Sequence, residues 1–217
     1  MGNLSGSTVV LSPHRLLCPH TACALVALAI SLCCAGCHSI QPLDTKPLDA
    51  AGMTYDSIQQ VKAMNVTAAE IAQIATARQG GFSDANCIAV VGIYHSRNQA
   101  FDAGDDISGL LRAEVAEDTI VELSKLNELG LASGEFEAMR LAGLSDAIVL
   151  EVARHRAAGK PVLAGASLAN LKNAGVRELT LLELARRGVP DSQATAILAY
   201  RHHGATDAQI ISHFASL

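Results

Sequence analysis

An all-α fold is predicted by three observations on the sequence. Apolar residues recur at helical spacing from residue 54 onward, as at Ile71, Ile74 and Ala75. No stretch in that region alternates apolar and polar residues convincingly, as a half-buried strand would. Hydrophobic residues make up 50% of the chain but aromatic residues only 3%, and this aliphatic composition suits closely packed helices. We therefore expect an array of short helices and helical hairpins.

The first element in chain order is an apolar segment near the amino terminus. Residues 1–20 contain no acid and a single basic side chain, Arg15, and residues 21–36 (TACALVALAISLCCAG) are all apolar or small. A helix needs about 20 residues to cross a bilayer, so this shorter run fits the core of a secretory signal peptide. We expect residues 1–36 to be a signal peptide.

The end of this segment reads Cys34-Ala35-Gly36-Cys37. It resembles a lipobox, the processing motif of bacterial lipoproteins, although Cys34 stands where leucine is usual. The resemblance implies that cleavage precedes Cys37, that Cys37 carries acyl chains, and that the protein is exported and anchored to a membrane. Because His38 rather than Asp follows the cysteine, the sorting rule of enterobacterial lipoproteins implies delivery to the outer membrane.

Two alternatives use the same residues. Cys34 and Cys37 also form a C-x-x-C pair, which in a folded redox domain would be a dithiol motif. The apolar run would instead serve as a membrane anchor if it were not cleaved. Beyond Cys37 the chain keeps only Cys87, so no intramolecular disulfide framework is expected. Cys87 lies in the apolar stretch CIAVV, and we expect an inert core thiol.

A tether and two helical regions are expected to follow. Residues 37–53 begin with Cys37, which the lipobox resemblance implies is lipidated, and they contain Pro42 and Pro47 among polar residues, which predicts an extended spacer. Residues 54–160 and 161–217 are the two helical regions, divided at Gly159–Gly165 (GKPVLAG) unless they form one continuous domain. The expected helix starts are the capping-box pairs Thr67 with Glu70 and Thr206 with Gln209, the caps Ser83 and Ser145, and Pro190 in a first helical turn.

One turn pattern recurs: a glycine or polar residue, an apolar residue, a cap and an acid. Glycine permits a left-handed turn, the apolar residue fills the space between two helices, and the cap with its acid starts the next helix. The copies are 33, 29, 45 and 16 residues apart, unlike the regular period of a solenoid. Degenerate repeats and independent reuse of good turn chemistry both explain this. The copies are Gly81–Asp84, Glu114–Asp118, Gly143–Asp146, Gly188–Asp191 and Gly204–Asp207.

Nucleic acid is not an expected partner. Leu171–Leu184 (LKNAGVRELTLLEL) resembles a helix-hairpin-helix DNA element but lacks the second glycine of that hairpin. The formal net charge of the chain is −5, whereas phosphates call for a basic surface.

No catalytic or cofactor motif is present, and no cofactor is expected. The sequence has no H-E-x-x-H, no G-x-S-x-G, no Walker loop and no dinucleotide-binding glycine pattern. The best group of reactive side chains is His202, His203, Asp207 and His213, which would suit zinc. Asp207 and His213 are six positions apart on one predicted helix and point about 120° away from each other, which favours surface histidines.

The function expected is that of a lipid-anchored, exported helical module that docks a protein partner or acts as a scaffold in the cell envelope. The alternative is a cell-envelope metalloenzyme or hydrolase that uses His202, His203 and His213. A third possibility is a protein that stiffens the envelope without a specific ligand.

Overall fold

The structure is a computed structural model that describes residues 43–130 and 132–214, and this part of the chain is helical without any strand. The all-α prediction is confirmed. The expected signal peptide, Cys34 and Cys37 lie outside the described residues. The helices are α2 (Lys46–Ala50), α3 (Tyr55–Ala63), α4 (Ala68–Gln79), α5 (Asp84–Ser96), α6 (Gly104–Arg112), α7 (Glu117–Lys125), α8 (Ser133–Leu141), α9 (Asp146–Ala157), α10 (Gly165–Asn173), α11 (Glu178–Arg186), the 3₁₀ helix η1 (Asp191–Gln193), α12 (Ala194–His202) and α13 (Asp207–Phe214).

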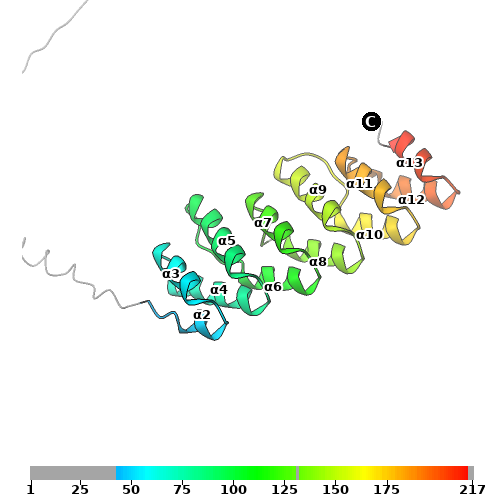
Figure 1. The fold of residues 1–217 in the computed structure, drawn as a ribbon. Coiled ribbons are helices and arrows are strands. Elements are labelled where there is room, and N and C mark those ends of the chain that lie inside the picture. The colour runs from blue at the N-terminus through cyan, green and yellow to red at the C-terminus, as the bar shows by residue number, and fades with distance from the viewer. Residues whose placement is uncertain (1–42, 131, 215–217) are drawn as a thin grey trace, which may run out of the picture. The chain divides into compact units, whose positions relative to one another are not determined.

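The helices stack in two layers, as Figure 1 shows. Each even-numbered helix packs on the next even-numbered helix, from α2 through α12, and these form the even layer. The odd-numbered helices from α3 through α13 stack in the same way and form the odd layer. Successive helices thus form stacked pairs, each of which buries its apolar face against its neighbours.

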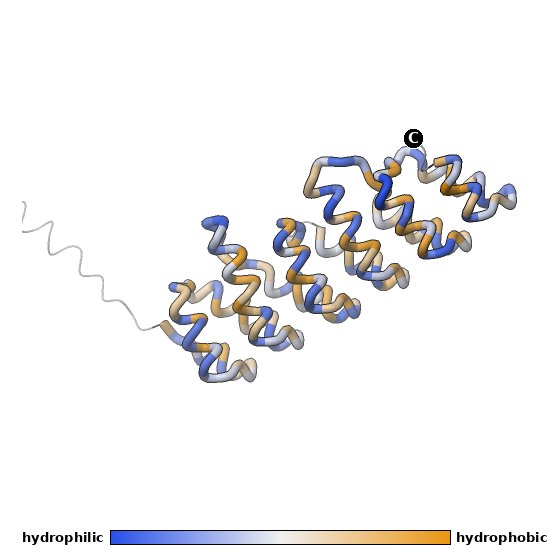
Figure 2. The backbone as a smooth tube through the Cα atoms, turned by 45° about the horizontal axis from the view of Figure 1, so that its top comes forward, coloured by the Kyte–Doolittle hydropathy of each residue, from blue (hydrophilic) through white to orange (hydrophobic). Residues whose placement is uncertain are grey.

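A continuous hydrophobic core lies between the layers. Its largest fully buried side chains include Phe82, Phe136 and Ile74, and aliphatic residues from every pair join them. Figure 2 shows apolar and hydrophilic residues alternating along the helices, as expected for helices with one buried face. The small-residue composition permits close approach. A Cβ atom on Gly104 would lie 2.1 Å from the backbone oxygen of Gln73, so α6 can approach α4 this closely only with glycine there.

The turn pattern is a regular repeat. Every even helix of the described chain reaches the next odd helix through a four-residue turn: 51–54, 80–83, 113–116, 142–145, 174–177 and 203–206. The second turn residue has a positive φ, and the third is a buried apolar residue. These apolar residues are 29, 33, 29, 32 and 29 positions apart, and they are Met53, Phe82, Val115, Leu144, Val176 and Ala205.

The uneven spacing expected from the sequence was wrong because one copy was misassigned and two were missed. Gly188–Asp191 connects α11 to α12 at the opposite edge, where the same turn chemistry starts a helix. The true copy is Gly175–Glu178, inside the segment that resembles a helix-hairpin-helix element. Gly52–Tyr55 is the first copy.

The expected tether is corrected over residues 43–53. This stretch forms α2 and the first turn, and Leu48 and Met53 are buried in the core. Pro47 lies in the first turn of α2, where its missing N–H costs no hydrogen bond, so this proline starts a helix rather than an extended spacer. At the other expected boundary, Gly159–Gly165, α8 packs on α10 and α9 on α11, and the described residues from Leu43 onward form one unit.

The helix-start predictions hold in part. The capping boxes at Thr67 and Thr206 are confirmed. Ser83 and Ser145 occupy N-cap positions, but neither side chain caps its own helix. Pro190 precedes the 3₁₀ turn η1 rather than lying in the first turn of α12.

Candidate functional site

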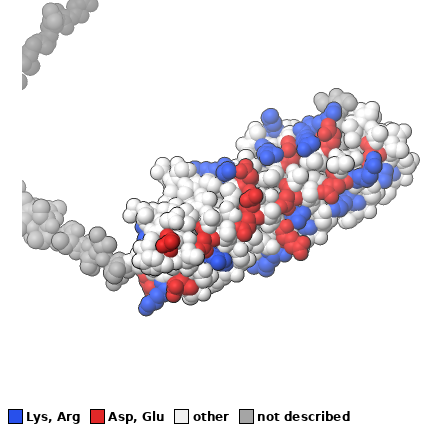
Figure 3. All heavy atoms as spheres, in the orientation of Figure 1, with Lys and Arg blue, Asp and Glu red and all other residues white. Residues whose placement is uncertain are grey.

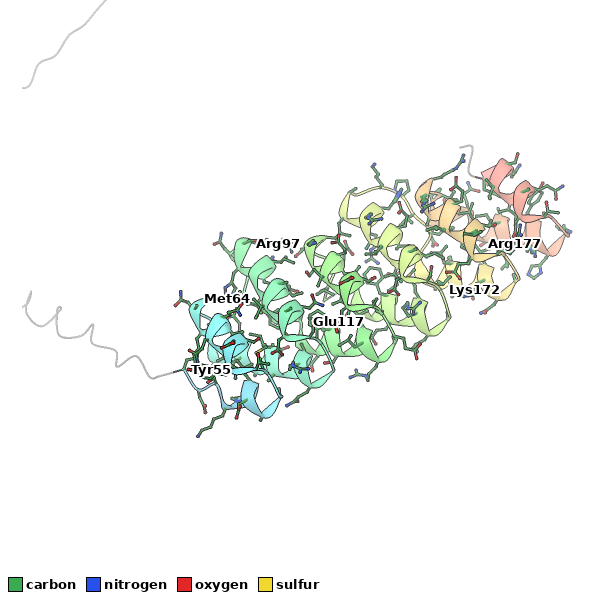
Figure 4. All side chains as sticks on the ribbon, viewed as in Figure 1. Tyr55, Met64, Arg97, Glu117, Lys172 and Arg177 are labelled. Carbon is green, nitrogen blue, oxygen red and sulfur yellow. The ribbon has the colours of Figure 1, made fainter. Side chains whose placement is uncertain are left out.

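The two edges of the array are built differently. The turn edge consists of the six four-residue turns, and the connection edge consists of the links from each odd helix to the next even helix, residues 64–67, 97–103, 126–132, 158–164 and 187–193. In Figure 4, Tyr55, Glu117, Lys172 and Arg177 lie toward the turn edge, and Met64 and Arg97 lie toward the connection edge.

A ladder of carboxylates closes the turn edge. In the first five turns, the last residue donates its backbone N–H to the acid that begins the odd helix of the following pair. The rungs are Thr54 to Asp84 (2.9 Å), Ser83 to Glu117 (3.0 Å), Ala116 to Asp146 (2.8 Å), Ser145 to Glu178 (3.1 Å) and Arg177 to Asp207. The acid of the sequence pattern therefore joins neighbouring pairs, besides complementing its own helix dipole.

Basic side chains secure four of these rungs. Arg140 pairs with Asp146 at 2.9 Å and donates to the backbone oxygens of Leu144 in its own turn and Glu114 in the preceding turn. The corresponding basic residues of the other three rungs are Arg78, Lys172 and Arg201. Each of the four basic residues lies four positions before the buried apolar residue of its turn. In α6, Leu111 occupies the equivalent position.

The remaining rung, from Ser83 to Glu117, uses hydroxyl and amide donors instead of a basic side chain. Glu117 accepts from the Ser83 hydroxyl at 2.6 Å and from the Asn86 amide at 2.7 Å. Burial raises the pKa of Asp84, Glu117 and Asp207, but the hydrogen bonds that each carboxylate accepts outweigh burial, so each pKa lies below its usual value.

The ladder stops at the first and the last described pair. At the first turn Tyr55 stands where the other pairs have an acid, and it is 74% exposed. At the last turn the backbone N–H of Thr206 donates to Gln209 within its own capping box, at 2.8 Å. No described pair lies beyond either end to supply the missing partner.

Two exposed leucines also lie at the turn edge. Leu141 ends α8 and is 77% exposed, and Leu179 follows the ladder acid Glu178 and is 81% exposed. The hydrogen bond from Ser145 to Glu178 joins the two turns that carry these leucines. Contiguous exposed apolar patches mark protein-binding surfaces, and these two side chains are candidates for such a patch.

Glu70 organises the connection edge. Its carboxylate accepts from the backbone N–H of Thr67 at 2.7 Å and of Phe101 at 3.0 Å, and it contacts His95 Nε2 at 2.7 Å. Burial raises the pKa of Glu70, but these hydrogen bonds outweigh it and lower the pKa to about 2. Glu70 therefore fixes the 97–103 connection on the body of the array.

A cavity lies beside this connection. It measures about 440 Å³ and is lined by Tyr94, Gln99 and Asp102 on one side and by Asn127 and Leu129 on the other. The ring of Tyr94 meets Phe101 edge to face, with 5.4 Å between centroids. Burial raises the pKa of Tyr94 to about 12, and the negative charges of Asp102 and Asp106 add to this effect.

The C-terminal histidines do not assemble a site with Asp207. Asp207 is buried and paired with Arg177 and Arg201 in the ladder. The ring of His213 stacks on Tyr200 at 5.2 Å, while His202 and His203 end α12 on the surface. Over the described residues, no group of three or more His, Cys, Asp or Glu side chains is arranged to hold a metal ion.

Cys87 is a core residue, as the sequence predicts. It is 2% exposed, and burial raises the pKa of its thiol to about 12. In residues 43–130 and 132–214, none of the helices has both the length and the apolar character to span a bilayer.

The visible face of the odd layer divides into two parts. In Figure 3 its surface over α3 and α5 carries few charges, whereas acidic and basic side chains alternate over α7, α9 and α11.

Comparison with known proteins gives no match, either to a protein-family model, to a curated protein or to a solved structure.

Proposed function

We propose that the protein is a bacterial lipoprotein that holds a protein partner at a cell-envelope membrane through the turn edge of its helical array. The lipobox-like residues preceding Cys37 support the anchor. The observation that carries the docking role is the pair Leu141 and Leu179, which are 77% and 81% exposed on two turns joined by a ladder hydrogen bond.

Repeated pairs suit this role physically. The ladder and the shared core fix neighbouring turns relative to each other, so the surface is ordered before a partner arrives, and less conformational entropy is lost on binding. The leucines supply apolar contact area, and the charged residues around them, including Lys172 and Glu178, supply a polar rim.

The anchor would keep the array close to the bilayer. Only six positions separate Cys37 from Leu43, which packs on the core, and such a segment spans at most about 20 Å even when fully extended. A partner bound at the array would therefore be held near the membrane surface.

The test compares partner recovery by variants purified from detergent-solubilised membranes. The double variant Leu141→Ser/Leu179→Ser is expected to lose at least about tenfold in affinity for the recovered partner, since two buried leucines contribute well over 1.4 kcal/mol. Tyr55→Ser, which removes an equally exposed side chain at the far end of the same edge, is the matched control and should keep the partner.

The anchor has its own readouts. Intact-mass spectrometry of the membrane fraction should show a chain that begins at an acylated Cys37, and Cys37→Ser should leave the membrane fraction while folding normally. Recovery of the same partner by all variants would remove the leucine pair from the proposal. A chain of full length that salt washes off the membrane would remove the anchor.

A further inference from the structure

The cavity at the connection edge is distinct from the proposed docking surface. Residues from the connection 97–103 and from the stretch 126–130 line it. Arg97 joins the first connection to this stretch by donating to Asn127 Oδ1 at 3.2 Å. It also joins the connection to the end of α7 by donating to the backbone oxygens of Ser124 and Lys125 at 2.8 and 2.5 Å. With Glu70 holding Phe101, both walls of the cavity are fixed to the array.

One polar side chain of the cavity has its body in the core and its hydroxyl without a protein partner. Tyr94 as a whole is only 8% exposed and lines the cavity, and its hydroxyl makes no hydrogen bond to any described residue. A hydroxyl that lines an open cavity without a protein partner is available to a ligand. The volume of about 440 Å³ falls within the range of small-molecule and side-chain pockets.

The charge of the lining selects the sign of that ligand. Asp102 is an exposed carboxylate on the rim, and Asp106 lies near enough to act on Tyr94, although its Oδ1 already accepts from the Ser133 hydroxyl. The basic side chain that acts on Tyr94, Arg97, is committed to backbone oxygens at the end of α7. The cavity therefore presents oxygen acceptors and uncommitted negative charge.

We infer that this cavity binds a primary ammonium group on an aliphatic stem. The ammonium has three donors and no acceptor, and three of the residues that line the cavity, Asp102, Tyr94 and Gln99, carry side-chain oxygens that can accept hydrogen bonds. Leu129 supplies an apolar wall for the stem. A lysine side chain of a polypeptide and a free alkylamine share this chemistry, and the inference does not depend on the anchor or on the leucine pair.

Ligand-observed NMR on the full chain tests the inference. The probes are the acetylated and amidated tripeptide Gly-Lys-Gly, its norleucine analogue, which keeps the stem without the charge, and n-butylammonium. The lysine peptide should receive saturation on its side-chain methylenes and bind at least about tenfold tighter than the norleucine peptide, because the charge–Asp102 contact is lost in the latter.

Three variants locate the site. Asp102→Asn should weaken lysine-peptide binding about tenfold and Tyr94→Phe about threefold, as expected for a charged and a neutral hydrogen bond. Asp105→Asn removes an exposed acid of the same segment that does not line the cavity, and it should change affinity less than twofold. Circular dichroism of each variant checks folding.

The outcomes are separable. Equal binding of lysine and norleucine peptides, or unchanged affinity in Asp102→Asn, overturns the inference. Binding of n-butylammonium as strong as that of the peptide supports the cavity with a free amine as its ligand. Peptide binding several-fold stronger supports a polypeptide ligand. Since Asp102→Asn leaves the turn edge intact, partner recovery through the leucine pair can fail or succeed independently.

Discussion

The two edges of the array solve the same problem of joining stacked helices in different ways. At the turn edge every link has four residues, and each ladder acid accepts a backbone N–H from the neighbouring pair. At the connection edge, links of seven residues follow the first link, and individual contacts such as those of Glu70 and Arg97 hold them. The short turns are joined rung by rung at one edge, whereas the longer links leave the cavity lined by Tyr94 and Asn127 at the other. Binding chemistry is accordingly easier to build where the repeat is relaxed.

The largest effect on stability should come from disrupting helix packing at the start of α6, directly after the 97–103 connection. Gly104→Ala places a Cβ 2.1 Å from the backbone oxygen of Gln73, so α4 and α6 must separate. We expect a loss of about 3 kcal/mol in the free energy of unfolding, measured by chemical denaturation. Gly134→Ala, at a helical glycine with open space around it, is the control and should not destabilise the protein.

Next in size is the removal of the charge that holds the 97–103 connection. Glu70→Gln should destabilise the protein by about 2 kcal/mol at pH 7, since an amide cannot replace a carboxylate that accepts several hydrogen bonds. The folded-state pKa of Glu70 is lowered from 4.5 to about 2, so its contribution is present above pH 4.5 and is lost as the pH falls toward 2. Unfolding curves of the variant should therefore lack this part of the acid dependence. A parallel pH dependence in both proteins would contradict the assignment.

A single rung of the turn edge should matter less, because neighbouring rungs and the core remain. Asp146→Asn keeps one acceptor for the Ala116 N–H but weakens the pairing with Arg140, and we expect a loss of about 1.5 kcal/mol in unfolding free energy. Tyr55→Asp is the informative control. It creates an acid at the ladder position where no described pair precedes it, so stability should change by less than about 0.5 kcal/mol. A gain comparable to the loss at Asp146 would contradict the ladder.

The smallest effect should be a stabilisation. Glu114 has a φ of 61° at the turn position where the other five turns have glycine. Glu114→Gly relieves the left-handed strain but gives the unfolded chain more freedom, so we expect a net gain of at most about 1 kcal/mol. The reverse change, Gly81→Ala, meets open space around its Cβ and should cost about 1 kcal/mol through backbone strain alone.

Local chemistry was predictable from the sequence, and stacking was not. The helices, the capping box at Thr67 and the burial of Cys87 follow from short-range patterns. The copy at Gly175–Glu178 does not match the sequence pattern because Arg177 occupies the cap position, where serine or threonine is the usual signal. The first copy escaped because Pro47 suggested an extended spacer and Tyr55 replaces the acid.

The cavity could not be predicted for a different reason. Tyr94 and Asn127 are 33 positions apart and come together only because α5 packs on α7. Neither residue belongs to a motif, and an unpaired hydroxyl is visible only once every neighbour is placed. The ladder acids were visible as a pattern, but their role as acceptors for the preceding pair depends on the same stacking.

The ladder gives the array a direction, since each donor precedes its acceptor along the chain. A duplicated block of one whole pair, 29 to 33 residues long, would insert between two interior pairs with every rung restored. Duplication of the first pair would instead place a second copy of Tyr55 in the interior of the array. The backbone N–H of the preceding Thr54 would then face a tyrosine instead of an acid and would lose its acceptor. Changes in length during evolution or by design are therefore tolerated in the middle of this protein and penalised at its amino-terminal pair.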